Sequence, residues 1–173
     1  NRNFLGYLAN YSISTQALEI FGIGTENFLG VVLYDESYGS ASLKLLNLTS
    51  NNKTEVFSMP CPNQCLDMTQ NPLNDKILVA TTKQIEQYSW NGTDLVFNEI
   101  YVNFEDVPQL TSTTQSRIKM HWNGNFLYVG FSDPYEVFQF NATETNASVI
   151  GQYVTQPPLS GWVLKDFIFL PGS

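Results

Sequence analysis

Six asparagines stand in the pattern Asn-x-Ser/Thr with no proline at the middle position, which is the acceptor pattern for N-linked glycans. The side-chain amide of such an asparagine receives an oligosaccharide only in a protein that enters the secretory pathway. About three such patterns would arise by chance from a composition this rich in asparagine, serine and threonine. The excess favours a secreted or cell-surface glycoprotein over an intracellular protein with accidental sequons. The six acceptors are Asn10, Asn47, Asn52, Asn91, Asn141 and Asn146.

The two cysteines, Cys61 and Cys65, lie in Pro-Cys-Pro-Asn-Gln-Cys and have the spacing of a small disulfide loop. A disulfide needs Cα atoms within about 7 Å, and the Pro-Asn pair between the cysteines favours the required turn. Free thiols and a bond to another chain are the alternatives. Redox catalysis is disfavoured because the spacing is not Cys-x-x-Cys. We therefore expect a local disulfide and an oxidising compartment.

Catalytic chemistry has few candidate residues in this sequence. Nucleophilic catalysis with a Ser-His-acid arrangement needs a histidine, and the single one, His121, lies in a predicted strand beside Trp122. Glycoside hydrolysis needs two carboxyl groups about 5 to 9.5 Å apart in a pocket. The adjacent acids Asp35-Glu36 and Glu105-Asp106 lie in predicted loops, where solvated charge is the simpler interpretation. We assign no catalytic residue and no metal site, and we expect no cofactor other than N-linked glycans.

Composition limits the class of protein and of partner. The chain has 173 residues, of which 43% are hydrophobic, and this is enough for one domain with a substantial core. Its formal net charge of -8 disfavours binding to a phosphate backbone, so no nucleic-acid partner is expected. No apolar run reaches the roughly 18 to 20 residues of a membrane-spanning helix. Because the chain opens on Asn-Arg-Asn instead of methionine, we expect it to be a processed or excised segment.

The hydrophobic pattern predicts strands in place of helices. Short runs of Val, Ile, Leu, Phe and Tyr alternate with clusters of Gly, Asn, Asp, Pro and Ser. A unit of four strands recurs, and its first strand contains in turn Leu18, Leu66, Ile118 and Leu164, at steps of 48, 52 and 46 residues. The second strand of each unit is almost entirely apolar, as in 28–33, 76–80 and 126–131, which indicates burial on both faces.

This strand order, period and turn chemistry resemble the β-propeller superfamily, in which four-stranded antiparallel blades surround an axis. The resemblance covers residues 16–170 and implies an all-β propeller segment with blades at about 16–64, 65–116 and 117–162. Since three blades do not close a ring, residues 1–15 and 163–173 are expected to form partial blades. The motifs of WD40, kelch, sialidase and integrin propellers are missing, so no subfamily is implied. A β-sandwich or a compact multi-hairpin domain is the alternative.

In such blades, the turn in which a sequon lies determines the face of the propeller on which its glycan would stand. Four of the sequons fall between the third and fourth strands of a unit, Asn47 lies just before such a turn, and Asn10 lies outside the pattern. We therefore expect glycans along one face and a possible binding face opposite, with the cysteine loop on it. The residues expected on that face are Asp35, Glu36, Tyr38, Glu105, Asp106, Asp133 and Tyr135.

These observations favour a non-catalytic extracellular scaffold. Its partners are expected to be other extracellular proteins or further blades of the same polypeptide, in an adhesion molecule, a receptor ectodomain or a surface-fibre subunit. The alternative is a fragment of a secreted carbohydrate-active enzyme whose active site lies partly on missing blades. An acidic calcium-binding module is a third hypothesis.

Overall fold

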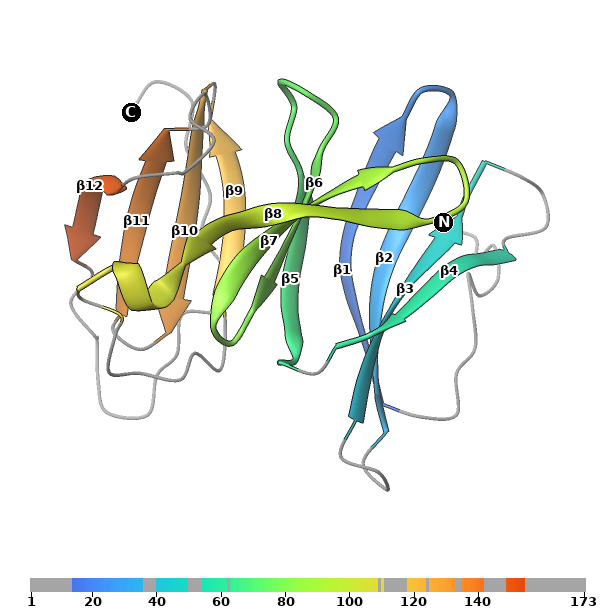
Figure 1. The fold of residues 1–173 in the computed structure, drawn as a ribbon, viewed down its shortest axis with the longest axis horizontal. Helices are drawn as coiled ribbons and strands as arrows, with labels where there is room; N and C mark the ends of the chain where they lie inside the picture. Colours follow the sequence, from blue (N-terminus) through green and yellow to red (C-terminus); the bar gives the residue numbers. More distant parts are fainter. Residues whose placement is uncertain are drawn as a thin grey trace, which may run out of the picture. The chain divides into compact units, whose positions relative to one another are not determined.

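The computed structural model describes residues 14–35, 40–49, 54–61, 63–108, 110, 118–123, 125–132, 135–141 and 149–154. Within these ranges the chain forms three four-stranded antiparallel sheets and one short 3-10 helix (Figure 1). In every sheet each strand pairs with the next strand in the sequence. The predicted all-β class, with blade-like sheets of four strands, is confirmed. The predicted blade limits and the single-segment organisation stay predictions.

The chain forms two compact units, Asn1–Pro62 and Asn63–Ser173. The first unit holds one sheet with the order β1-β2-β3-β4. Its apolar cluster comprises Leu29, Val31, Leu33 and Leu46, with Leu48 packed against it. The strands are β1 Ser14–Ile23, β2 Glu26–Asp35, β3 Ser40–Asn47 and β4 Thr54–Pro60.

The second unit holds the other two sheets, with the orders β5-β6-β7-β8 and β9-β10-β11-β12. Its strands are β5 Cys65–Gln70, β6 Ile77–Thr81, β7 Gln84–Trp90, β8 Leu95–Asn103, β9 Ile118–Asn123, β10 Phe126–Ser132, β11 Tyr135–Asn141 and β12 Val149–Val154. All five residues of β6 are buried, and so are residues 127–131 of β10. These two strands bear out the burial that their continuous apolar runs predict.

One core joins the two sheets of the second unit. It takes Leu78 and Ile85 from the first sheet and Phe131, Phe138 and Phe140 from the second, all fully shielded from solvent. Phe131 and Phe138 meet edge to face, with ring centroids 5.5 Å apart. Such a pair adds about 0.5 to 1.5 kcal/mol beyond the burial of its apolar area.

A buried carboxylate links the first strands of these two sheets. Asp67 on β5 is only 3% exposed, and one of its oxygens accepts a hydrogen bond from the backbone N–H of Met120 on β9, at 2.8 Å. Its other oxygen lies 3.1 Å from the ammonium of Lys119. Asp67 therefore connects β5 to β9, although the two strands belong to different sheets.

Burial raises the pKa of Asp67, while the charge of Lys119 and the N–H donors of Met120 and Met68 oppose that rise. The folded state consequently holds the Asp67 proton more tightly than the unfolded chain does. This difference in proton binding therefore adds most to the free energy of unfolding below the pKa that Asp67 has in the unfolded chain. The contribution falls as the pH rises through the pKa of Asp67 in the folded state.

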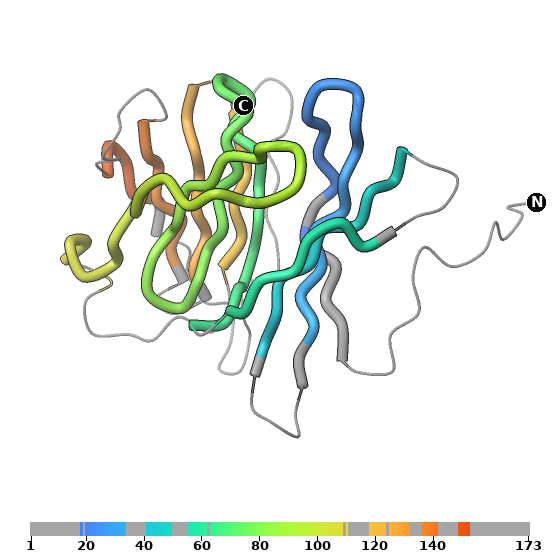
Figure 2. The backbone as a smooth tube through the Cα atoms, turned by 45° about the vertical axis from the view of Figure 1, so that its right-hand side comes forward, coloured from blue at the N-terminus to red at the C-terminus, as the bar shows by residue number. Residues whose placement is uncertain are grey.

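The last strand of each sheet carries at least one β-bulge. In β4 the register shifts between Phe57 and Glu55, and in β12 it shifts between Gly151 and Val149. β8 has two shifts, which leave Asn98 and Tyr101 as extra residues, and the strand follows a bent path in Figure 2. Bulges bend and twist the strand that contains them.

Replacing Asp67 with alanine should destabilise the protein by about 2 to 4 kcal/mol, because it leaves the Met120 N–H and a mostly buried Lys119 ammonium without their acceptor. Urea unfolding measures the loss. It should be greater at about pH 4 than at about pH 8, since the Asp67 contribution falls with rising pH. Asp106→Ala, which removes an exposed acid of the same unit, is the matched control and should change stability far less. Equal losses in the two variants would contradict this role of Asp67.

Candidate functional site

The structure describes only part of the predicted site. It includes Glu105, Asp106, both cysteines and the acceptors Asn47, Asn91 and Asn141, together with the backbone of Asp35 and Tyr135 at strand ends. The remaining predicted residues lie outside the described ranges: Asn10, Asn52, Asn146, Glu36, Tyr38 and Asp133.

The turn between β6 and β7 is organised by the hydroxyl of Thr81. This oxygen accepts hydrogen bonds from the backbone N–H groups of Lys83 and Gln84, at 3.3 and 3.1 Å. It also donates to the carbonyl of Gln84, at 3.0 Å. Thr81 is buried, so these bonds satisfy a hydroxyl that water does not reach. The turn therefore has a fixed shape.

The same turn holds two neighbouring loop segments. The carbonyl of Asn63 accepts from the backbone N–H and the hydroxyl of Thr82, at 3.0 and 2.8 Å. The carbonyl of Lys83 accepts from the backbone N–H of Phe104, at 3.1 Å. These bonds place Asn63 of the cysteine loop, and Phe104 at the start of the segment with Glu105 and Asp106, next to the β6–β7 turn. We call the surface formed by Asn63, Thr82, Lys83, Glu105 and Asp106 the loop surface.

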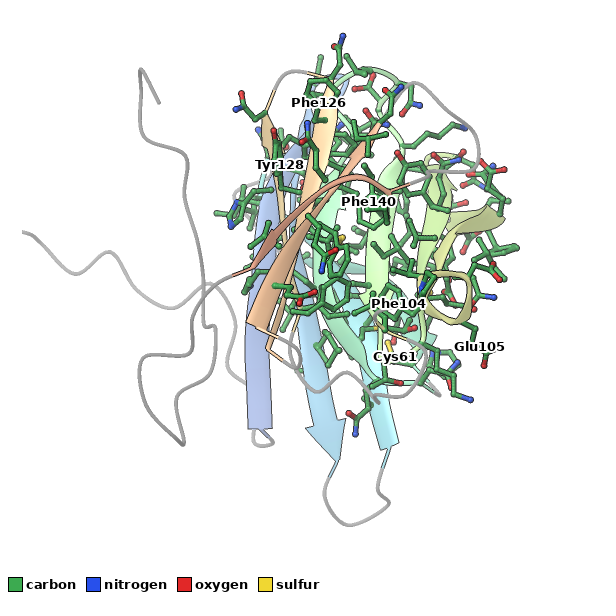
Figure 3. The ribbon with its side chains drawn as sticks, turned by 90° about the vertical axis from the view of Figure 1, so that its left-hand side faces the viewer. Cys61, Phe104, Glu105, Phe126, Tyr128 and Phe140 are labelled. Carbon is green, nitrogen blue, oxygen red and sulfur yellow. The ribbon has the colours of Figure 1, made fainter. Side chains whose placement is uncertain are left out.

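Glu105 and Asp106 lie on the 3-10 helix η1 Phe104–Asp106, where both are exposed. The side chain of Asn103 caps this helix by accepting from the Glu105 N–H, at 3.2 Å. The ring of Phe104 is buried and meets the ring of Phe131 edge to face at 5.2 Å. Figure 3 shows Phe104 and Glu105 at one end of the second unit and Phe126 at the other.

Val107 and Leu110 complete the anchor of this loop. Both are buried, and backbone bonds run from the Val107 N–H to the Phe104 carbonyl and from the Leu110 N–H to the Val107 carbonyl. The sequence pattern points to the acids of this segment but not to the buried residues that anchor it. The apolar residues at 104, 107 and 110 have the three-residue spacing of a 3-10 turn, which could have revealed them.

Cys61 and Cys65 are disulfide-bonded to each other, as their spacing predicts, and both are buried. Within the five-residue loop, Gln64 adopts a positive φ of 53°. A non-glycine residue takes this conformation only at some cost in strain, and the covalent closure of the loop offsets that cost.

Asn91 lies in the exposed turn between β7 and β8. Its side-chain oxygen accepts from the backbone N–H groups of Thr93 and Asp94, at 2.9 and 2.8 Å. The Thr93 hydroxyl lies 3.0 Å from that oxygen and 3.0 Å from a carboxylate oxygen of Asp94. Gly92 has a φ of 103°, which favours glycine. The sequon therefore forms a compact Asx turn that faces solvent.

The other two described acceptors have different surroundings. Asn47 is half-buried, and its amide nitrogen donates to the carboxylate of Glu26 at 3.0 Å. Its oxygen accepts from the Thr49 N–H at 2.8 Å. Asn141 is half-buried at the end of β11, opposite Phe126. Of these three acceptors, Asn91 is the most open to solvent.

Groups that could support other chemistry are placed as follows. Within the described ranges, no three residues of the His, Cys, Asp and Glu types lie close enough to hold a metal ion. His121 is half-buried on β9, opposite Tyr128.

Burial and the neighbouring Glu86 carboxylate raise the pKa of Tyr88, whose hydroxyl donates to that carboxylate. In the part of the chain that the structure describes, no helix is long and apolar enough to cross a membrane.

No protein-family model matches the chain, and no curated protein matches it significantly. The roles of the residues above therefore depend on their own geometry.

Replacing Phe104 with alanine should destabilise the second unit by about 3 to 5 kcal/mol, because it removes a large buried ring from the core. The same change should release η1, so limited proteolysis near Glu105 should become faster. Glu105→Ala keeps the anchor and should change stability by less than about 0.5 kcal/mol. If Phe104→Ala unfolds at the same urea concentration as Glu105→Ala, the anchoring role is wrong.

Proposed function

We propose that this chain belongs to an extracellular or cell-surface glycoprotein and that its sheets are propeller blades forming a non-catalytic scaffold for protein contacts. The observation that carries the proposal is the loop surface. Glu105 and Asp106 are exposed there on the η1 turn. The Phe104 N–H donates to the Lys83 carbonyl and the Val107 N–H donates to the Phe104 carbonyl, so the backbone is bonded on both sides of the acids. The Phe104 ring packs against Phe131 in the core. A surface with this much internal support loses little conformational entropy when a partner binds.

The charge of the chain indicates the chemistry of the partner. Glu105 and Asp106 are exposed side by side, and the formal net charge of the chain is -8. A protein surface rich in lysine and arginine would be attracted to these acids, which would raise the association rate and select against acidic partners. Two loop surfaces facing each other would repel through these acids.

The extracellular location is supported by the disulfide and by the Asn91 turn. Disulfides persist in oxidising compartments and are rare in the cytosol. Asn91 lies at the β7–β8 end of its sheet, whereas the loop surface lies at the β6–β7 end. A glycan on Asn91 would leave the loop surface uncovered.

If the proposal holds, the chain secreted from a eukaryotic host should carry glycans at Asn52, Asn91 and Asn141. Enzymatic deglycosylation in water enriched in oxygen-18, followed by peptide mass spectrometry, identifies each occupied site by the labelled aspartate it leaves. Thr93→Ala should remove the glycan at Asn91 alone while secretion continues. A secreted chain that is unmodified at all three asparagines would contradict the proposed glycan-bearing face.

The double variant Glu105→Lys and Asp106→Lys should weaken binding to a basic partner about tenfold or more, mainly by slowing association. The partner is sought on an array of secreted and cell-surface ectodomains, and surface plasmon resonance measures the rates. Asp94→Lys changes an exposed acid at the other end of the same sheet and should leave binding nearly unchanged. Equal weakening by both variants, or hydrolysis of a glycan panel by the unaltered chain, would count against the scaffold.

A further inference from the structure

The turn that presents Asn91 has the chemical features of a second, non-enzymatic modification. Asn91 is followed by Gly92, and both are exposed. We propose that Asn91 deamidates spontaneously, at a rate increased by the fold, whenever it carries no glycan. Three features of the turn support this: a polarised carbonyl, an unhindered nucleophile and an exposed leaving group.

The side-chain carbonyl of Asn91 is polarised by fixed donors. Two backbone N–H groups, of Thr93 and Asp94, point at its oxygen from 2.9 and 2.8 Å. The Thr93 hydroxyl lies 3.0 Å from this oxygen and 3.0 Å from a carboxylate oxygen of Asp94, and it shares its one proton between the two. Nucleophilic attack on the carbonyl carbon places negative charge on this oxygen. Donors already aimed at the site where charge develops stabilise the transition state.

The nucleophile is the backbone nitrogen of Gly92. Glycine has no side chain to shield this nitrogen, and Gly92 is exposed to solvent. Hydroxide can therefore approach and remove the amide proton. The φ of 103° also keeps a glycine at this position, because other residues rarely adopt it.

The reaction is balanced without an oxidant or a cofactor. The Gly92 nitrogen loses its proton to hydroxide and forms a bond to the Asn91 Cγ atom. The bond from Cγ to Nδ2 breaks, and the nitrogen leaves as ammonia after taking a proton from solvent. One water molecule then opens the succinimide ring to aspartate or isoaspartate.

Deamidation and glycosylation exclude each other at this position. A glycan on Nδ2 replaces the small leaving group with a substituted amide, and deamidation removes the acceptor nitrogen permanently. The product adds one negative charge to the β7–β8 turn. The isoaspartate form also places an extra carbon in the backbone beside Gly92.

The test uses the full chain produced without glycosylation and with its disulfide formed. It is incubated at mildly alkaline pH, both folded and in urea, and peptide mass spectrometry follows aspartate and isoaspartate at residue 91. We expect Asn91 to react about 2- to 10-fold faster in the folded chain, the range that a single net hydrogen bond provides. The dipeptide Asn123-Gly124 is measured in the same digest as a reference for the conditions.

The variants Thr93→Val and Thr93→Ser form a matched pair, since both are small and only serine keeps the hydroxyl. Thr93→Ser should react at the unaltered rate, and Thr93→Val should react about 2- to 5-fold more slowly in the folded state. Circular dichroism confirms that both are folded. If Asn91 reacts no faster in the fold than in urea, or if valine and serine give equal rates, the inference is wrong.

Discussion

The carboxylate of Asp67 is the interaction on which the second unit depends. The first strands of its two sheets approach each other, yet they belong to separate hydrogen-bonded sheets. Asp67 bridges them by accepting from the Met120 backbone and from the Lys119 ammonium. Burying an ion is expensive, and a buried pair is retained where its hydrogen bonds fix one arrangement among several. With β5 held to β9, side chains from the two sheets pack together in the shared core.

The loop surface derives its order from that core. Phe131 lies at the centre of an aromatic chain, with Phe138 on one side and Phe104 on the other. The first contact belongs to the sheet, and the second belongs to the loop that carries Glu105. A side chain that packs this sheet therefore also positions the loop that carries the acids, so the core and the proposed contact surface cannot vary independently.

Much of this fold could be predicted from the sequence because it depends on local patterns. The recurrence of Leu18, Leu66 and Ile118 marks the first strand of each sheet, and the Cys-Pro-Asn-Gln-Cys spacing predicts the disulfide. The role of Asp67 could not be predicted. An acid between Leu66 and Met68 fits the alternation of apolar and polar residues in a strand with one face in solvent, and this pattern would predict an exposed Asp67. In the fold β5 is buried on both faces, and its acid finds partners about fifty residues away along the chain. The bulges also escape prediction, since a register shift is a property of a pair of strands.

The bulges in β4, β8 and β12 have a consequence for assembly. An incoming strand extends a sheet by matching a regular series of free N–H and C=O groups along its edge, and each extra residue interrupts that series. β8 is interrupted twice, at Asn98 and Tyr101, and it bends as well. Edges of this kind are poor templates for polymerisation through the backbone. If such a molecule is built into a surface fibre, backbone pairing at these three edges would not join its subunits, and side chains and loops would make the contacts instead.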